Sequence, residues 1–253
     1  MLRAINKETE YLKDGDIYCN VCNTPKTFLF DGKRIEGNCM CIIYKHEAEV
    51  KRNNEERLKA RIATLKAESD IGDRYFNATF KNSEKATEHA KAIKYCNETI
   101  NNYNKGLSMF FHGATGTGKT RTMACILNRL AEKLYTVYFT RFTDIMRKYK
   151  AAESFTSKES QEDVIDFYTK KIDFLFIDDL GTEFMRSTDT VMQRLIYDII
   201  NGRLNNYKPM ILSSNFKLSE LITQGGFDAR VVWRLNEVCK NYIVGFNGRN
   251  WRE

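Results

Sequence analysis

A glycine-rich octapeptide near the middle of the chain has the residue types that bind phosphate. It reads Gly113, Ala114, Thr115, Gly116, Thr117, Gly118, Lys119 and Thr120. Its glycines let backbone N–H groups curl around phosphate oxygens, while Lys119 suits the β- and γ-phosphates and the Thr120 hydroxyl suits Mg²⁺. An apolar run at residues 107–112 precedes it and a helix-forming stretch at 119–130 follows it. The sequence therefore predicts an ATP-binding P-loop from Gly113 to Arg121, with a chance glycine-rich turn as the alternative.

Polar side chains end two further apolar runs. Residues 172–178 finish at Asp178, with Asp179 next, and residues 210–214 are followed by Asn215. Strand ends of a parallel sheet meet at one edge, beside the phosphate loop. We therefore expect Asp178 to hold Mg²⁺ through water, Asp179 to polarise the attacking water and Asn215 to orient that water. An acidic turn, and a simple turn residue at 215, are the alternatives.

Two late arginines lie four residues apart on a predicted helix that Asp228 caps. Arg230 and Arg234 are like charges at i and i+4, and Arg230 lies near the positive end of the helix dipole. A phosphate held by a neighbouring subunit would offset both unfavourable effects. Pairing with Glu237 or another surface acid is the alternative interpretation.

Four of the seven cysteines fall in one short segment. They form two close pairs, Cys19 with Cys22 and Cys39 with Cys41. Two close pairs joined by a hairpin-like insert predict tetrahedral thiolate coordination of zinc, with no open position and hence a structural role. His46 is a possible substitute ligand. Redox cysteines or disulfides are the alternative, which an intracellular location disfavours.

Composition and charge exclude several classes of protein. The chain has 253 residues, is 42% hydrophobic and carries a net charge of +7, which fits a folded protein and permits contact with a polyanion. No apolar stretch reaches the roughly 18 residues of a membrane span, and no secretion signal is evident at the start of the sequence. We expect a soluble cytoplasmic protein that does not contact membranes.

The elements that position these groups are predicted from periodicity. Residues 1–42 are loop-rich, residues 43–68 predict a solvated helix with the apolar stripe Leu58, Ile62 and Leu65, and the remainder alternates strands with helices. The predicted helices include residues 83–103, with Ala86, Ala90, Ile93 and Ile100 on one side, and residues 190–205. The predicted strands are residues 107–112, 136–140, 172–178, 210–214 and 242–246. The fold class is α/β with a five-stranded parallel sheet. We divide the chain into a zinc-binding domain with a linker helix, residues 1–68, and an ATPase domain, residues 69–253.

Together these motifs resemble the DnaC/DnaI-type replicative helicase loaders, a branch of the AAA+ ATPases that also includes the IstB transposition ATPases. The resemblance covers most of the chain. It rests on the segment Ile-Gly-Asp-Arg-Tyr-Phe-Asn-Ala-Thr-Phe at residues 71–80 and on residues 113–120, 177–181, 213–215 and 230–235.

The resemblance implies a protein that binds a hexameric replicative helicase and delivers it onto single-stranded DNA, with ATP as a switch. The N-terminal region would grip the helicase, and zinc there matches the four cysteines. Asp178 and Asp179 would be the Walker B pair and Asn215 the sensor 1 residue. Arg234 resembles an arginine finger acting in trans within an assembly on the helicase, with Arg230 beside it; which of the two is the finger stays open.

Two departures from the AAA+ pattern bear on mechanism. Asp179 stands where most of these proteins have glutamate, so we expect slow hydrolysis. Only residues 247–253 follow the last predicted strand, so we expect no C-terminal helical lid, as in the loaders.

The segment from Arg141 to Lys150 mixes basic and aromatic residues. In the resembling family this region faces single-stranded DNA, and Phe142 and Tyr149 would offer stacking surfaces. The alternative is an ordinary amphipathic helix, because Phe142, Ile145 and Tyr149 also fit a packing stripe.

Two other functions remain open at this point. One is an IstB-like ATPase that serves a transposase on duplex DNA. The other is a helicase-binding regulator with negligible ATP turnover, which Asp179 in place of glutamate would suit.

Overall fold

The computed structural model describes residues 6, 8–83, 87–154, 158–181 and 190–247. The chain divides into two compact units, residues 1–60 and residues 61–253. In the described part, no helix is both long enough and apolar enough to cross a lipid bilayer. The dividing point falls inside helix α1 (Met40–Ala67), which contributes to both units.

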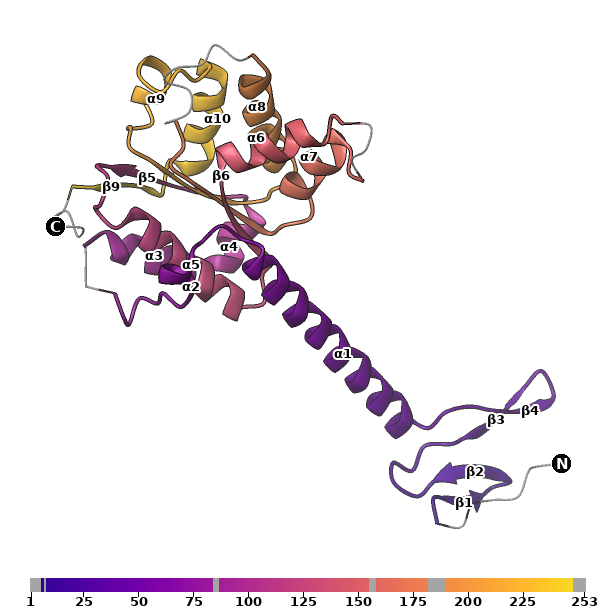
Figure 1. The fold of residues 1–253 in the computed structure, drawn as a ribbon. Helices are drawn as coiled ribbons and strands as arrows, with labels where there is room; N and C mark the ends of the chain where they lie inside the picture. Colours follow the sequence, from indigo (N-terminus) through magenta and orange to yellow (C-terminus); the bar gives the residue numbers. More distant parts are fainter. Residues whose placement is uncertain (1–5, 7, 84–86, 155–157, 182–189, 248–253) are drawn as a thin grey trace. The chain divides into compact units, whose positions relative to one another are not determined.

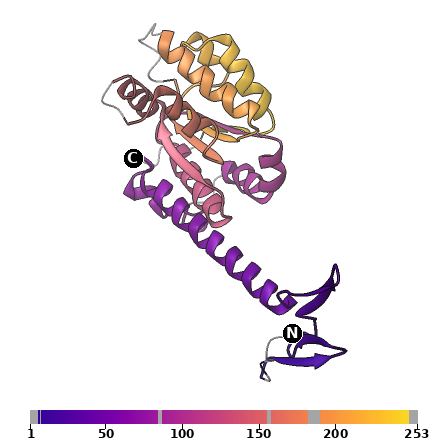
Figure 2. The same ribbon diagram turned by 90° about the vertical axis from the view of Figure 1, so that its right-hand side faces the viewer.

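The N-terminal unit consists of two β-hairpins and the first part of α1 (Figures 1 and 2). Strand β1 (Glu10–Lys13) pairs with β2 (Asp16–Cys19), and β3 (Thr27–Phe30) pairs with β4 (Lys33–Glu36), both antiparallel. Each hairpin turns on an Asp-Gly pair whose two residues have positive φ, as a two-residue type I′ turn requires. The carboxylate of Asp16 joins the hairpins by accepting hydrogen bonds from the Thr27 hydroxyl at 3.0 Å and Arg34 Nε at 2.8 Å.

The second unit is built on a sheet of five parallel strands. These are β5 (Met109–Gly113), β6 (Val137–Arg141), β7 (Phe174–Asp178), β8 (Met210–Ser214) and β9 (Ile243–Phe246). Their order across the sheet is β6-β7-β8-β5-β9, and every pair is parallel. Each strand overlaps one of the five predicted runs, so the predicted α/β fold with a five-stranded parallel sheet is confirmed.

Helices cover both faces of this sheet (Figure 1). One hydrophobic layer is formed with α2 (Asp73–Phe76), α3 (Thr87–Asn97), α4 (Thr99–Asn104) and α5 (Lys119–Glu132). The other is formed with α6 (Phe142–Ala151), α7 (Gln161–Thr169), α8 (Thr190–Asn205), α9 (Glu220–Thr223) and α10 (Ala229–Cys239). The last turns of α1 join the second layer through Leu65. Polar side chains at the carboxyl ends of the strands are thereby left at one open edge.

One predicted helix is wrong in its detail. The stretch predicted at residues 83–103 is two helices, α3 and α4, that meet at Glu98. Ala90 is exposed and Ile100 is 72% exposed, so the predicted apolar stripe, which puts both on one side of a single helix, is not the face that packs. Ala86 lies outside the described residues. Tyr95 and Cys96 are buried instead. Alanines are tolerated both inside and outside, so a stripe drawn through them did not identify the face that packs.

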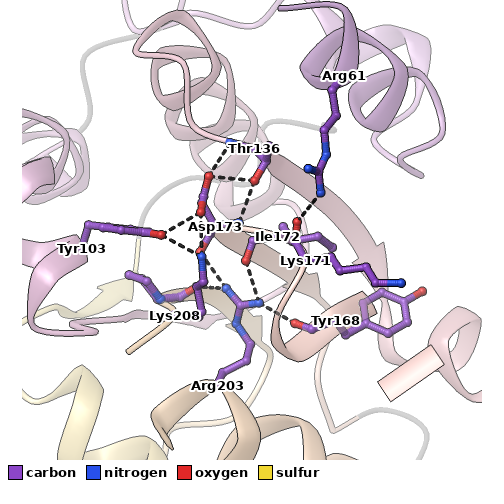
Figure 3. A network of polar contacts seen from close by, with 10 residues as sticks. Arg61, Tyr103, Thr136, Tyr168, Lys171, Ile172, Asp173, Arg203 and Lys208 are labelled. Carbon is purple, nitrogen blue, oxygen red and sulfur yellow. Dashed lines mark hydrogen bonds and ion pairs between the residues drawn. The ribbon is translucent and has the colours of Figure 1, made fainter. Parts of the chain in front are cut away.

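A polar network fastens the amino ends of three strands (Figure 3). Arg203 of α8 is fully buried and donates hydrogen bonds to four main-chain carbonyls. These belong to Tyr168, Ile172, Asp173 and Pro209. The carboxylate of Asp173 accepts from Thr136 N at 2.9 Å, from the Tyr103 hydroxyl at 2.7 Å and from Lys208 Nζ at 2.8 Å. Residues 136, 173 and 209 directly precede β6, β7 and β8, so the network sets the mutual alignment of those strands.

Candidate functional site

The phosphate loop has the backbone that its glycines permit. Gly116 and Gly118 have φ of 86° and 98°, in the left-handed region where a side chain is strained. A Cβ at Gly113 would lie 2.2 Å from the carbonyl oxygen of Phe246 on β9, so no other residue fits there. The loop therefore leads into the amino end of α5, where the helix dipole favours an anion.

Lys119 lies inside this loop. Its Nζ donates to the carbonyl of Gly113 at 2.7 Å, to that of Ala114 at 3.0 Å and to Oδ1 of Asn215 at 3.1 Å. The Thr115 hydroxyl also lies 3.5 Å from Asn215 Oδ1. The lysine and asparagine predicted to serve one phosphate site are therefore brought together from β5 and β8.

Asp178 ends β7 directly opposite the start of α5. Its Oδ2 accepts a hydrogen bond from the Thr120 hydroxyl at 2.9 Å, and its Oδ1 accepts one from the Ser213 hydroxyl. Burial raises the pKa of Asp178, and the neighbouring charge of Asp179 raises it further, against the hydrogen bonds from Ser213 and Thr120. A cation would remove this unfavourable burial of charge. The oxygen-only donor set of Thr120 and Asp178 fits Mg²⁺, which prefers few protein oxygens and several waters.

Asp179 is exposed and has a φ of 53°. Its N–H donates to the Ser213 hydroxyl at 3.0 Å, and its side chain lines the same pocket as the phosphate loop. The left-handed backbone turns the chain sharply after β7. Asp179 therefore borders the pocket that the phosphate loop also lines.

A pocket of about 340 Å³ opens over the loop. Residues 115–122, Asp179 and Phe246 form one side. The other side was not predicted from the sequence: Arg74, Tyr75, Asn82, Ser83 and His89. Arg121 connects the two sides by donating from Nε to the Ser83 hydroxyl at 2.9 Å and from Nη2 to the Asn82 carbonyl at 2.6 Å. The pocket thus has a phosphate-binding half and a half with aromatic rings that suits a base.

His89 belongs to the aromatic half. Its Nε2 lies 3.1 Å from the Thr122 hydroxyl, and its ring meets Phe80 edge to face with centroids 5.5 Å apart. Burial lowers the pKa of His89, and the charge of Arg121 acts in the same direction against that of Glu88. The imidazole is therefore neutral at physiological pH. Of the residues in this half, only Arg74 and Tyr75 lie in the segment 71–80, on which the family resemblance partly rests. The spacing of that segment carries no phosphate or metal pattern.

The two late arginines lie on α10 and outside this pocket. Asp228 caps the helix as predicted, accepting from Arg230 N at 2.8 Å, and the Arg230 guanidinium also bonds this carboxylate. Arg234 Nη1 lies 3.8 Å from Glu237 Oε2. Within one chain both arginines therefore use nearby acids, as the alternative interpretation held. Neither arginine lines the pocket over the phosphate loop.

The four predicted zinc ligands meet in the N-terminal unit. The Sγ atoms of Cys19, Cys22, Cys39 and Cys41 all lie within 4.8 Å of one another. Cys19 ends β2, Cys39 directly precedes α1 and Cys41 lies in its first turn. The Cys41 sulfur lies 3.5 Å from that of Cys19 and 3.1 Å from that of Cys39. Zn–S bonds of about 2.3 Å place tetrahedral sulfurs about 3.8 Å apart, so the spacing fits zinc. His46 is exposed and is not part of this cluster.

The thiols of the cluster cannot all ionise side by side without a cation. The Thr24 hydroxyl, 2.9 Å from the Cys22 sulfur, lowers the pKa of Cys22 to about 6. The neighbouring sulfurs of Cys39 and Cys19 raise the pKa of Cys41 to about 12. Like charges this close disfavour one another. A divalent metal would allow all four to be thiolates, which is the chemistry of a closed structural zinc site.

The predicted DNA segment forms α6, and its aromatic residues face inward. Phe142 and Ile145 are fully buried, and Tyr149 packs against the same core. The packing-stripe alternative is therefore right, and the predicted stacking surface of Phe142 is wrong. The exposed side of α6 keeps basic residues, including Arg147 and Lys150.

Comparison with known proteins gives the family. The sequence model of the family described as "IstB-like ATP binding protein" matches residues 38–229, which is most of the chain. This chain belongs to the IstB-like ATP-binding family. The matched range includes the P-loop, both aspartates and Asn215, and it ends just before Arg230.

Relatives of this IstB-like protein include proteins of DNA replication and of a phage-like element. It is 26% identical over 229 residues to the replicative helicase loader DnaI of Bacillus subtilis, covering 87% of this chain and 70% of DnaI. It is 30% identical over 144 residues to the phage-like element PBSX protein XkdC of Bacillus subtilis, covering 54% of this chain but only 49% of XkdC.

Solved structures show the same fold. The crystal structure of DnaI superposes with a TM-score of 0.58 at 23% identity, covering 73% of this chain and 95% of that one. The DnaC helicase loader superposes with a TM-score of 0.58 at 24% identity, covering 70% of this chain and all of that one, 100%. The IstB-like chain thus has the fold of the DnaI and DnaC structures over most of its length.

Proposed function

We propose that this protein is an ATP-dependent loader that binds a hexameric replicative DNA helicase and delivers it onto single-stranded DNA at the start of replication. One observation carries the proposal: the similarity to DnaI covers 87% of the chain. This share is larger than the share of the chain that the second unit, residues 61–253, makes up. The similarity therefore reaches beyond the ATPase core into the N-terminal unit.

The ATPase site supports a switch. Lys119 and residues 113–118 would hold the phosphates of ATP, with Arg121 at the edge, while Thr120 and Asp178 would hold Mg²⁺. Asp179 would polarise the attacking water and Asn215 would orient it. Because a side chain one methylene shorter than glutamate reaches less far, we expect slow hydrolysis. Arg234, with Arg230 beside it, would complete the site of a neighbouring copy assembled on the helicase.

The N-terminal unit has the surface that partner binding requires. Its hairpin β3–β4 exposes Phe28, Leu29 and Phe30 by 45%, 68% and 67%. Large apolar side chains that remain exposed in so small a unit favour a protein partner. We propose that zinc holds this unit, within residues 1–68, in the form that binds the helicase. Residues 69–253 would be the ATPase domain, and the protein would act in the cytoplasm without a membrane.

A loading assay tests the proposal. The purified full-length chain is mixed with the replicative helicase of its own organism and with circular single-stranded DNA covered by single-strand binding protein. ATP-dependent appearance of helicase on the DNA is the expected result. Leu29→Ser should weaken helicase binding, while Val21→Ser, at another exposed apolar position (78%), is the matched control.

Two other outcomes would redirect the assignment. One of them is an IstB-like ATPase that serves a transposase, which would bind duplex DNA in preference to single strands and capture no helicase. Full loading by a Lys119→Ala variant would instead indicate a helicase-binding regulator that does not depend on ATP turnover.

A further inference from the structure

Ser213 contacts both aspartates at the end of β7. Its side chain is fully buried at the end of β8, between the metal-binding and the water-polarising positions. We infer that Ser213 is a positioning residue: its single hydroxyl orients the carboxylate of Asp178 toward Mg²⁺ and holds the main chain of Asp179 in place. The inference rests on the proposed magnesium–ATP site.

The direction of the two hydrogen bonds is determined. The N–H of Asp179 can only donate, and it lies 3.0 Å from the Ser213 oxygen. A hydroxyl has one hydrogen and accepts through its lone pairs. The Ser213 hydrogen is therefore left for Oδ1 of Asp178, which it reaches. One hydroxyl thus links a main-chain donor of one aspartate to the carboxylate of the other.

This link fixes the plane of the Asp178 carboxylate. With Oδ1 held by Ser213, Oδ2 faces the Thr120 hydroxyl at 2.9 Å. The two protein oxygens that fit Mg²⁺ are therefore presented side by side. Groups that orient a metal-binding carboxylate usually change metal affinity when they are removed.

The same hydroxyl supports a strained turn. Asp179 has a φ of 53°, an unfavourable conformation for a residue with a side chain. The Ser213 oxygen satisfies its N–H, and the Ser213 carbonyl accepts from Leu180 N at 2.7 Å. Together these bonds hold the exposed carboxylate of Asp179 at the border of the pocket.

The adjacent serine provides a matched control. Ser214 is also fully buried and also makes two hydrogen bonds, donating to the Leu180 carbonyl at 2.6 Å and accepting from Phe216 N at 3.1 Å. Neither of these bonds reaches a carboxylate. Ser214→Ala therefore measures the cost of losing a buried serine hydroxyl at this strand end without altering the aspartates.

The test measures metal affinity and stability in the full-length protein. Mn²⁺ replaces Mg²⁺, and its binding to the protein–ADP complex is followed by electron paramagnetic resonance; ADP affinity in EDTA and unfolding by urea are measured in parallel. Ser213→Ala should weaken Mn²⁺ binding by about tenfold or more while ADP affinity in EDTA stays unchanged. Ser213→Thr, which keeps the hydroxyl, should recover Mn²⁺ affinity, and Ser214→Ala should lower stability alone.

The outcomes separate this inference from the proposed function. If Ser213→Ala binds Mn²⁺ as Ser214→Ala does, or loses ADP affinity in EDTA, the positioning role is overturned and the ATP-dependent function stands. If the unaltered protein binds neither ADP nor Mn²⁺ with ADP, the proposed nucleotide function is overturned and this inference with it.

Discussion

The amino group of Lys119 lies 3.1 Å from Oδ1 of Asn215. The contact joins the phosphate loop after β5 to the end of β8, two segments far apart in sequence. The same amino group also meets two loop carbonyls. These neutral oxygens accept the hydrogen bonds of the Lys119 ammonium group that phosphate oxygens would otherwise accept. Nucleotide binding should therefore replace them with charged phosphate oxygens and release Asn215 to face the γ-phosphate.

Replacing Lys119 and replacing Asn215 should therefore have different effects on ATP affinity and on hydrolysis. Lys119→Ala removes the cation and should weaken ATP binding by about a hundredfold or more, since hydrogen bonds between charged groups are the strong ones. Asn215→Ala should leave ATP affinity nearly unchanged and lower hydrolysis by about a hundredfold, as expected for a group that acts mainly in the transition state. Titration with a fluorescent ATP analogue and single-turnover hydrolysis measure the two effects. Equal loss of affinity in both variants would show that Asn215 is a ground-state phosphate contact.

Zinc should be necessary for the N-terminal unit. Cys39→Ser removes one thiolate and should lower the zinc content from one equivalent to background while the hairpins unfold, because so small a unit has little apolar core. Cys125→Ala, which removes a buried cysteine outside the cluster, should retain its zinc. Metal analysis and NMR spectra before and after chelation make the comparison. Full zinc content with intact hairpins in Cys39→Ser would contradict four-thiolate coordination.

The network around Arg203 should be a main source of stability in the second unit. Arg203→Met removes the donor for four main-chain carbonyls and should cost about 3 kcal/mol or more of unfolding free energy. Arg194→Met, on the exposed side of the same helix with an 84% exposed side chain, should cost little. Urea denaturation measures both. An equally small change in the two variants would mean that the carbonyls find other donors.

Asp173 should make the free energy of unfolding depend on pH in the acidic range. Burial alone would raise its pKa, but the hydrogen bonds from Lys208, Tyr103 and Thr136 outweigh burial and lower the pKa below the ordinary 3.8. As the pH falls, Asp173 therefore takes up a proton in the unfolded chain before it does so in the folded protein. The stabilisation of the folded state by the Asp173 carboxylate is thus present above pH 3.8 and is lost below it. Asp173→Asn should reduce the fall in unfolding free energy between about pH 6 and about pH 3. Asp166→Asn, at an i,i+4 ion pair with Lys170 on the surface of α7, is the control for the loss of a carboxylate outside the network.

The sheet and the phosphate site could be predicted because each depends on local pattern. Buried parallel strands appear as short apolar runs, and a P-loop sets its own flanking strand and helix. The contacts of Lys119 with Asn215 and of Thr120 with Asp178 then follow from parallel strands that end at one edge. No such rule places Arg74 or His89, since their position depends on how α2 and α3 pack.

The arrangement of α6 shows a second reason why some features could not be predicted from the sequence. Phe142 satisfied a stacking pattern and a packing pattern equally well, and only the presence of a core beside α6 decides between them. Ser213 likewise lies in the Ser-Ser-Asn motif at residues 213–215, and the motif alone predicts no role for it. Its importance depends on a hydroxyl meeting two groups on another strand, which no spacing along the chain encodes.

Single-stranded DNA should bind through the exposed cations of α6 and not through its aromatic residues. Arg147→Ala and Lys150→Ala should each lower the salt dependence of binding, by about 0.7 in log–log slope for each lost phosphate contact. Lys94→Ala, on α3 and 68% exposed, should not alter the slope. Phe142→Ala should cost about 3 kcal/mol of stability, as large buried side chains do. Anisotropy of labelled oligothymidine at several salt concentrations measures the slopes, and a slope unchanged in both α6 variants would remove this helix from the DNA site.

The arginine finger should be supplied by a neighbouring copy, since Arg230 and Arg234 both lie outside the pocket of their own chain. Arg234→Ala should reduce hydrolysis on the helicase by about a thousandfold, while Glu237→Ala, which only frees Arg234 from its local acid, should not reduce it. Mixing Arg234→Ala with Lys119→Ala should restore turnover, because intact phosphate loops on one variant then meet intact arginines on the other. The same mixture made with Arg230→Ala shows whether that residue acts in trans as well. If neither mixture exceeds its separate components, the arginines do not act between copies, and their pairing with Asp228 and Glu237 is sufficient to explain them.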